Sequence, residues 1–313
     1  MNIVFLDSSS LPSPLERPAV ALDWDERPAT SSDELVAALS GAQVAVTNKV
    51  KITRAALEQL PELKFICVAA TGYDCIDLAA CRDMGVTVSN VPAYSAVSVA
   101  EAVIGSIFVL RRHLLAYRQA AVEHWPSSAH FCVHGKPVLD VEGTTLGIFG
   151  RGDIGSRVAR LAKALGMNVL FAEHRGATTV RSGYHAFERV LEQAEILTLH
   201  CPLTPQTHHL IGEPEIARIK SGAILINTAR GPLVDESAVL RGLQSGKLGG
   251  AALDVLAVEP PPATHPLLNF EHSGLLITPH VGWASQTSVE RLKTVILKNI
   301  AAYAEARPIN VGS

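Results

Sequence analysis

The sequence predicts an α/β protein built from two doubly wound parallel-sheet domains. Short apolar runs alternate with helical stretches along nearly the whole chain, one strand runs directly into a glycine-rich loop, and the alternation falls into two series. Such alternation is typical of parallel sheets that carry helices on both faces. At roughly 150 residues per domain, the 313 residues suffice for about two domains.

The first series occupies the N-terminal part of the chain. Between its first two strands, Ser31 and Glu34 fit a capping box, which predicts a helix that begins there and runs through Ala38. Three apolar runs are predicted to be buried strands: Asn2–Leu6, Gln43–Thr47 and Leu63–Ala70.

The second series follows a domain boundary near Ser98. Ser98 and Glu101 fit a second capping box, which predicts a long apolar helix through Leu114. An irregular stretch, His124–Leu139, comes next, and Ser285–Ala306 is expected to form one long final helix. Six strands are expected between these segments: Leu146–Phe149, Asn168–Ala172, Ile196–His200, Ala223–Asn227, Ala251–Val255 and Leu275–Thr278.

The composition excludes several classes of protein. Lys and Arg total 27 and Asp and Glu total 30, a net charge of −3, so the basic excess of a nucleic-acid-binding protein is missing. No apolar run reaches the ~18 residues of a membrane-spanning helix, and the N-terminus reads as a strand rather than a signal peptide. The five cysteines form no C-x-x-C pair, which favours a cytoplasmic location.

A glycine-rich loop follows the first strand of the second series. Gly150, Gly152 and Gly155 have the G-x-G-x-x-G spacing of dinucleotide-binding folds, where they serve a tight turn, a close approach to the pyrophosphate, and the packing of helix on strand. Asp153 and Ile154, at the start of the next helix, present backbone N–H groups to the phosphates. The loop therefore predicts binding of a dinucleotide.

The acid that ends the next strand indicates which dinucleotide is bound. Glu173 lies 18 residues beyond Gly155, where it can accept hydrogen bonds from the adenosine ribose hydroxyls, so NAD is expected. Arg175 is a counter-signal, since an arginine there could accept the 2′-phosphate of NADP. A solvated surface charge is the favoured interpretation of Arg175.

Three side chains after later strands have the types that hydride transfer to a 2-oxo acid needs. Arg230 can hold the carboxylate and polarise the carbonyl, His280 can donate the proton, and Glu259 can orient the histidine and favour its protonated form. Taken singly, they could be a surface charge, a buried histidine and a helix-entry residue. No metal site is predicted, because the adjacent His208 and His209 point in different directions and lack a third ligand.

Taken together, these segments resemble the D-isomer-specific 2-hydroxyacid dehydrogenases, and within them the NADH-dependent glycerate dehydrogenases, also called hydroxypyruvate reductases. The resemblance runs essentially end to end. The motifs that carry it are the glycine loop with Val68–Asp74, Asn90–Ser95, Ser98–Glu101, Phe171–Ala177, His200–Thr204, Ile226–Gly231, Ala252–Val255 and Thr278–His280.

The resemblance implies a flavodoxin-like substrate domain, residues 1–97 plus 285–313, and an inserted NAD-binding Rossmann domain, residues 98–284. It implies reduction of a short 2-oxo acid, such as hydroxypyruvate or glyoxylate, to the D-2-hydroxy acid. It also implies a homodimer that forms through the Ser98–Leu139 region.

The resemblance further assigns roles to individual residues. Arg230, Glu259 and His280 would be catalytic. Thr71 and Gly72 would bind the substrate carboxylate through backbone N–H groups, together with Arg230 and His280. The nicotinamide side of NAD would lie against Asp254, Pro202 and the backbone of Thr228, Ala229 and Arg230.

Some positions depart from the usual pattern of this family. Ala102 and Asp74 stand where many members have His and Asn, and Glu173 stands where many have Asp. An alternative function on the same fold is a corepressor that senses NAD(H) and binds peptide partners. That alternative predicts disordered flanking tails, which the sequence does not indicate.

Overall fold

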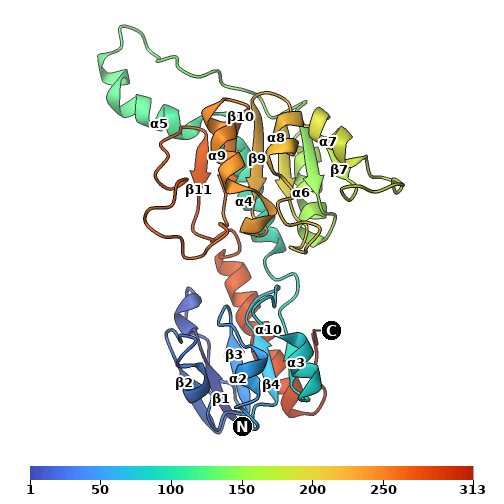
Figure 1. Cartoon of the computed structure of the whole chain (residues 1–313). Helices are drawn as coiled ribbons and strands as arrows, with labels where there is room; N and C mark the ends of the chain where they lie inside the picture. Colours follow the sequence, from blue (N-terminus) through green and yellow to red (C-terminus); the bar gives the residue numbers. More distant parts are fainter. Residues whose placement is uncertain (313) are drawn as a thin grey trace. The chain divides into compact units, whose positions relative to one another are not determined.

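The computed structural model describes residues 1–312, which form two compact units (Figure 1). The first unit contains Met1–Ser95 and the chain from Ala284 onward, and the second contains Ala96–Trp283. Each unit is built around one sheet in which every pairing is parallel. The predicted class, two doubly wound parallel-sheet domains, is confirmed.

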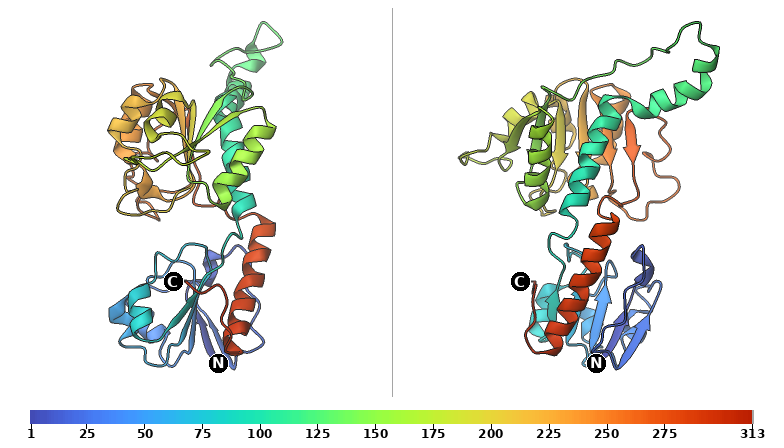
Figure 2. Two further views of the ribbon diagram at one scale, coloured as in Figure 1. Left: turned by 90° about the vertical axis from the view of Figure 1, so that its right-hand side faces the viewer. Right: turned by 180° about the vertical axis from the view of Figure 1, so that it is seen from behind.

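The sheet of the first unit has five strands in the order β2-β1-β3-β4-β5. Figure 2 shows the long helix α10 on one face and the short helices on the other. The strands are β1 (Asn2–Phe5), β2 (Asp23–Glu26), β3 (Val44–Thr47), β4 (Phe65–Val68) and β5 (Thr87–Ser89), and the helices are α1 (Leu35–Ala38), α2 (Arg54–Leu57), α3 (Leu78–Asp83) and α10 (Gln286–Ala304).

Helix α10 belongs to the first unit because its apolar stripe packs there. Val289, Leu292, Ile296 and Ile300 recur at helical spacing and are at most 3% exposed. The Tyr303 ring, just beyond them, stacks on Phe65 of β4 with the ring centroids 4.3 Å apart. The C-terminal helix therefore completes the core that the N-terminal strands begin.

The sheet of the second unit has six strands in the order β11-β10-β9-β8-β6-β7. Its strands are β6 (Thr145–Phe149), β7 (Asn168–Ala172), β8 (Ile196–Leu199), β9 (Ala223–Asn227), β10 (Leu248–Leu253) and β11 (Leu275–Ile277). Its helices are α4 (Ala96–Arg111), α5 (Leu114–Glu123), α6 (Asp153–Ala164), α7 (Phe187–Gln193), α8 (Glu213–Arg218) and α9 (Glu236–Gln244).

The helices of the second unit divide between the two faces of its sheet. Helices α4 and α6 share one core with the sheet, and α7, α8 and α9 share the other. The strand order reverses between β6 and β8, because the chain runs outward from β6 to β7 and then returns to β8 on the other side. Ligands of open α/β sheets bind beyond the carboxyl ends of the strands at such a reversal, so the fold locates a site beside Gly150.

The first predicted capping box forms in part. The Glu34 carboxylate accepts hydrogen bonds from the Ser31 N–H and hydroxyl, and helix α1 ends at the predicted Ala38, but it begins only at Leu35. The second predicted capping box is wrong, because α4 begins at Ala96 and Ser98 lies inside it, where its hydroxyl donates to the Gly282 carbonyl over 2.6 Å.

The long helix predicted through Leu114 is in fact two helices. Helix α4 ends at Arg111, and His113 adopts the left-handed conformation with φ 51°, after which α5 begins. Strands β2 and β5 were not predicted, and the predicted strand from Ala251 begins earlier, at Leu248. Within residues 1–312, no helix combines the length and the apolar character that crossing a membrane requires.

Candidate active site

The glycine loop begins where β6 ends, and two of its glycines are required by packing. A Cβ on Gly155 would lie 2.1 Å from the Gly150 carbonyl oxygen. Gly150 has a φ of +110°, and a Cβ there would lie 2.5 Å from the His200 carbonyl oxygen. Only glycine fits either position, which gives the turn and the helix–strand contact their predicted shape.

Gly152 is different, because no protein atom lies within 4 Å of where its Cβ would be. It is the N-cap of α6 and has no side chain to accept hydrogen bonds from the first N–H groups of that helix, which begins with Asp153 and Ile154. Open space in front of an uncapped helix N-terminus fits the pyrophosphate of a dinucleotide.

Glu173 follows β7 directly and lies beside the glycine loop, since Ala172 pairs with Phe149 in register. Its side chain is 3% exposed, and its carboxylate accepts hydrogen bonds from Arg181 Nε and Nη2, each over 2.7 Å. The backbone N–H groups of His174 and Arg181 also donate to it. The Arg181 hydrogen bonds, with the His174 N–H second, lower the pKa of Glu173 to about 2.

Arg175 is turned toward the protein. Its guanidinium faces the Glu215 carboxylate and the carbonyls of Gln206 and His209, each over 3.4 Å, and its side chain is 35% exposed. The preferred interpretation as a solvated charge therefore describes this side chain only in part.

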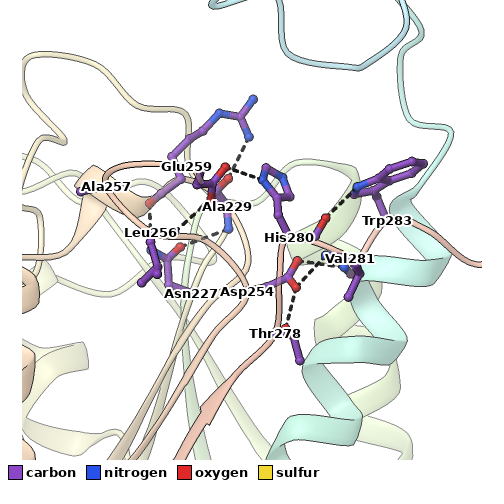
Figure 3. Close-up of polar contacts among 12 residues, drawn as sticks. Asn227, Ala229, Asp254, Leu256, Ala257, Glu259, Thr278, His280, Val281 and Trp283 are labelled. Atoms are coloured by element: carbon purple, nitrogen blue, oxygen red, sulfur yellow. Dashed lines mark hydrogen bonds and ion pairs between the residues drawn. The ribbon is translucent and has the colours of Figure 1, made fainter. Parts of the chain in front are cut away.

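The predicted acid–base pair is assembled in the structure. The Nδ1 of His280 and the Oε2 of Glu259 are 2.7 Å apart, and the other oxygen of Glu259 accepts from the Leu256 N–H over 3.0 Å (Figure 3). The side chains of His280 and Glu259 are 28% and 35% exposed. Because Nδ1 is hydrogen-bonded to Glu259, Nε2 is the ring nitrogen that can contact a substrate.

Arg230 lies in the loop after β9, which packs directly against the loop that carries Glu259. A Cβ on Gly231 would be 2.0 Å from the Leu256 carbonyl carbon, so only glycine permits this approach. The Asn227 side chain holds the loop by donating to the Arg230 carbonyl and accepting from the Ala229 N–H. Arg230 Nη1 donates to the Ala229 carbonyl over 2.8 Å (Figure 3).

Asp254 anchors the loop that carries His280. Its carboxylate, in a residue only 6% exposed, accepts from the Thr278 hydroxyl and from the N–H groups of Val281 and Gly282 over 2.6–2.9 Å. A carboxylate has about four acceptor sites, so one remains for a donor such as the nicotinamide carboxamide.

His280 itself has an uncommon backbone conformation, with φ 54°. Such conformations persist in a non-glycine residue only where the surroundings hold them, and they concentrate at functional sites. The Trp283 indole N–H donates to the His280 carbonyl over 2.9 Å and helps to hold it. Sequence reasoning missed Trp283, Asn227 and Thr278; the nearest signal was their position within or beside the quoted motifs.

Two buried polar atoms near the strand ends have no hydrogen-bond partner within residues 1–312, the Thr228 hydroxyl and the His200 Nδ1. Burial lowers the pKa of His200 to about 3, so its imidazole is neutral. Buried polar groups are nearly always satisfied, and the Thr228 hydroxyl therefore fits a bound polar ligand. With the open cradle at Gly152, the residues present fit NAD.

The expectation that His208 and His209 point in different directions is wrong, because their rings stack with centroids 4.0 Å apart. Within the part of the chain that the structure describes, no group of three His, Cys, Asp or Glu side chains could hold a metal ion.

The remaining predicted residues, Thr71 and Gly72, belong to the first unit, where they follow β4. The Thr71 hydroxyl donates to the Val91 carbonyl, and the Thr71 carbonyl accepts from the Asn90 side chain. The loop is thereby fixed by its neighbours. Pro202, in the second unit, is exposed after β8, and its carbonyl accepts from the Thr207 hydroxyl.

Comparisons with known proteins agree with this geometry. Residues 104–282 match the family model described as D-isomer specific 2-hydroxyacid dehydrogenase, NAD binding domain. A putative 2-hydroxyacid dehydrogenase of Haemophilus influenzae is 44% identical over 310 residues, which cover 97% of this chain and 98% of the relative. A glycerate dehydrogenase of Methylorubrum extorquens is 40% identical over 312 residues, with coverage of 99% and 98%. The solved structure of a D-lactate dehydrogenase of Aquifex aeolicus, complexed with NAD and lactic acid, has a TM-score of 0.83, 28% identity and 100% coverage of both chains.

Proposed function

We propose a substrate and residue roles for this chain, which belongs to the D-isomer-specific 2-hydroxyacid dehydrogenase family and is an NAD-dependent oxidoreductase of hydroxy acids. The substrate is a short 2-oxo acid, hydroxypyruvate or glyoxylate, which is reduced to D-glycerate or glycolate. The name of the glycerate dehydrogenase relative supports hydroxypyruvate. The reaction takes place in the cytoplasm, which the five free cysteines support.

The His280–Glu259 pair carries this proposal. In the reductive direction the imidazolium Nε2–H donates its proton to the carbonyl oxygen of the substrate as the alkoxide develops. Glu259 holds Nδ1 over 2.7 Å and balances the positive charge of the ring. In the oxidative direction the neutral ring accepts the hydroxyl proton at the same nitrogen.

Arg230 binds the substrate carboxylate and polarises the carbonyl, because its planar guanidinium can donate two parallel hydrogen bonds. We also assign substrate binding to the backbone N–H groups of Thr71 and Gly72. When bound, NAD(H) supplies or accepts the hydride. We assign coenzyme binding to Gly150, Gly152, Asp153, Ile154, Gly155, Glu173, Pro202, Thr228, Ala229, Arg230 and Asp254.

The test is NADH oxidation with hydroxypyruvate, glyoxylate and pyruvate, for wild type and Arg230→Ala. In the variant, kcat should fall and KM should rise, since the guanidinium both binds the substrate carboxylate and polarises the carbonyl. Arg241→Ala is the control, because Arg241 forms an exposed ion pair with Glu213 elsewhere in the second unit. Tight NADH binding without turnover of any 2-oxo acid would instead favour the corepressor alternative.

We also propose that the chain forms a homodimer through α5 and the loop after it. This arm extends from the rest of the second unit in Figures 1 and 2, and α5 has no buried residue. Apolar patches of this kind typically mark interfaces. Seven large apolar side chains of this arm are exposed: Leu114, Leu115, Val122, Trp125, Phe131, Val138 and Leu139.

Light scattering of the intact chain tests the dimer. Wild type should have twice the mass of one chain, and Leu115→Asp should reduce it to one. Leu22→Asp, at a position that is 82% exposed in the first unit, should stay dimeric. A monomeric wild type would contradict the proposal.

A further inference from the structure

Glu173 cannot accept a ribose hydroxyl in the structure as it stands. Its Oε1 accepts from the His174 N–H and Arg181 Nη2, and its Oε2 accepts from Arg181 N–H and Nε. These four bonds fill the roughly four acceptor sites of a carboxylate. Movement of the Arg181 guanidinium away from Glu173 would free two of them.

Arg181 is held in this place by the fold. The segment from Arg181 to His185 turns back along β7, where the Glu173 N–H donates to the His185 carbonyl and the His185 N–H to the Phe171 carbonyl, each over 2.8 Å. The Arg181 guanidinium also lies 4.1 Å from the centre of the Tyr184 ring. The side chain is nevertheless 53% exposed, so its N–H donors that Glu173 does not use can meet a ligand.

A second arginine adds positive charge on the same side. Arg151, within the glycine loop, lies 4.7 Å from the centre of the Phe171 ring and 5.5 Å from that of Tyr184. The Tyr184 ring is therefore a platform shared by Arg151 and Arg181. The charge of Glu173 is cancelled by Arg181, so the protein surface beside the end of β7 carries the remaining positive charge of Arg151.

We propose that Arg181 determines coenzyme choice by masking Glu173: it occupies the acceptor sites that the ribose diol of NADH needs and offers its remaining donors to the 2′-phosphate of NADPH. The inference rests on the proposed coenzyme site. The acidic strand end, which by itself indicates NADH, is thereby converted into a site that tolerates both coenzymes.

The test is to measure Kd for NADH and NADPH by fluorescence titration of the intact chain. Wild type should bind the two within about tenfold of each other. In Arg181→Met, NADH should bind more tightly and NADPH more weakly, so the ratio of Kd for NADPH to Kd for NADH should rise by about tenfold or more, the size of one hydrogen bond to a charged group. Arg181→Lys keeps the positive charge but loses the planar guanidinium that donates two bonds to Glu173, so it should raise the ratio less.

Two further variants isolate the cause. Glu173→Gln should lower the ratio, and in that background Arg181→Met should no longer tighten NADH, because no carboxylate is left to unmask. The control is Arg54→Met, which removes an exposed arginine paired with Asp83 in the first unit and should leave the ratio unchanged.

The possible failures are distinguishable. An unchanged ratio in Arg181→Met, with NADH-dependent turnover intact, overturns this inference and leaves the proposed function standing. A wild type that binds neither coenzyme overturns both.

Discussion

Two glutamates of the second unit follow strands of the same sheet, and each pairs with a basic side chain over 2.7 Å. Glu173 binds Arg181 at one end of the sheet, and Glu259 binds His280 toward the other. The Glu173 side chain is 3% exposed, while that of Glu259 is 35% exposed. At the same pairing distance, the Glu173 carboxylate is therefore closed to solvent and the Glu259 carboxylate is accessible.

The partner decides what each pair can do. Arginine does not lose its proton in proteins, so the Glu173–Arg181 pair is fixed in charge and acts on binding alone. Histidine gains and loses a proton near neutral pH, so the Glu259–His280 pair can perform acid–base chemistry. Proton transfer should therefore depend on the Glu259–His280 pair, and coenzyme choice on the Glu173–Arg181 pair.

The largest effect is expected from His280→Ala, which removes the proposed proton donor. Loss of a general acid costs about 10²- to 10⁴-fold in rate, so kcat should fall by that factor at every pH while Kd for NADH stays unchanged. Arg241→Ala is again the control, since its exposed ion pair with Glu213 lies outside the proposed site and should leave kcat unchanged. Weakened NADH binding in His280→Ala would show that the two regions are not separate.

Asp254→Asn should have the next largest effect. The amide cannot accept from all three donors, so at least one buried N–H loses its partner at a cost of about 1–3 kcal/mol, and kcat should fall roughly 10- to 100-fold as the His280 loop shifts. Thr278→Val removes one donor and should cost less. Steady-state kinetics of both variants check the order, and an unaltered kcat in Asp254→Asn would contradict the anchoring role.

The sequence predicts fold elements well where burial alone determines them. Ala223–Asn227 is a strand with the predicted bounds, and all of its residues are buried in the middle of the sheet. Asp23–Glu26 could not be predicted, because it is a polar edge strand whose existence depends on backbone pairing with β1. Ser98 likewise shows the limit of a capping pattern, since its hydroxyl bonds a carbonyl 184 residues away.

The same division holds for the candidate site. His280 and Glu259 could be predicted to meet because both follow adjacent strands of a parallel sheet. The Arg181–Glu173 contact could not, since it depends on a segment without regular structure that turns back along β7. Nor could the anchoring of the His280 loop by Asp254, because two of its three bonds come from backbone N–H groups, whose positions residue types do not encode.

Glu259→Gln sharpens the comparison with a smaller effect. The change removes the negative charge that favours the protonated imidazole and keeps the size of the side chain. Reductive kcat/KM should then fall by about tenfold, because the imidazolium in the transition state loses the charge that balances it. Steady-state kinetics of both enzymes measure this. An unchanged kcat/KM would mean that Glu259 does not support His280 in the reaction.

The smallest effect is expected from pH on coenzyme binding. The hydrogen bonds from Arg181 lower the pKa of Glu173 to about 2 from the ordinary 4.5. The ion pair therefore stabilises the folded protein fully above pH 4.5, and this stabilisation is lost only as the pH falls toward 2. Between about pH 6 and 9 neither member of this pair changes charge, so Kd for NADH should vary less than about twofold. Titrations with NADH across that range check this, and a Kd that changed severalfold would mean that a group outside this pair controls coenzyme binding.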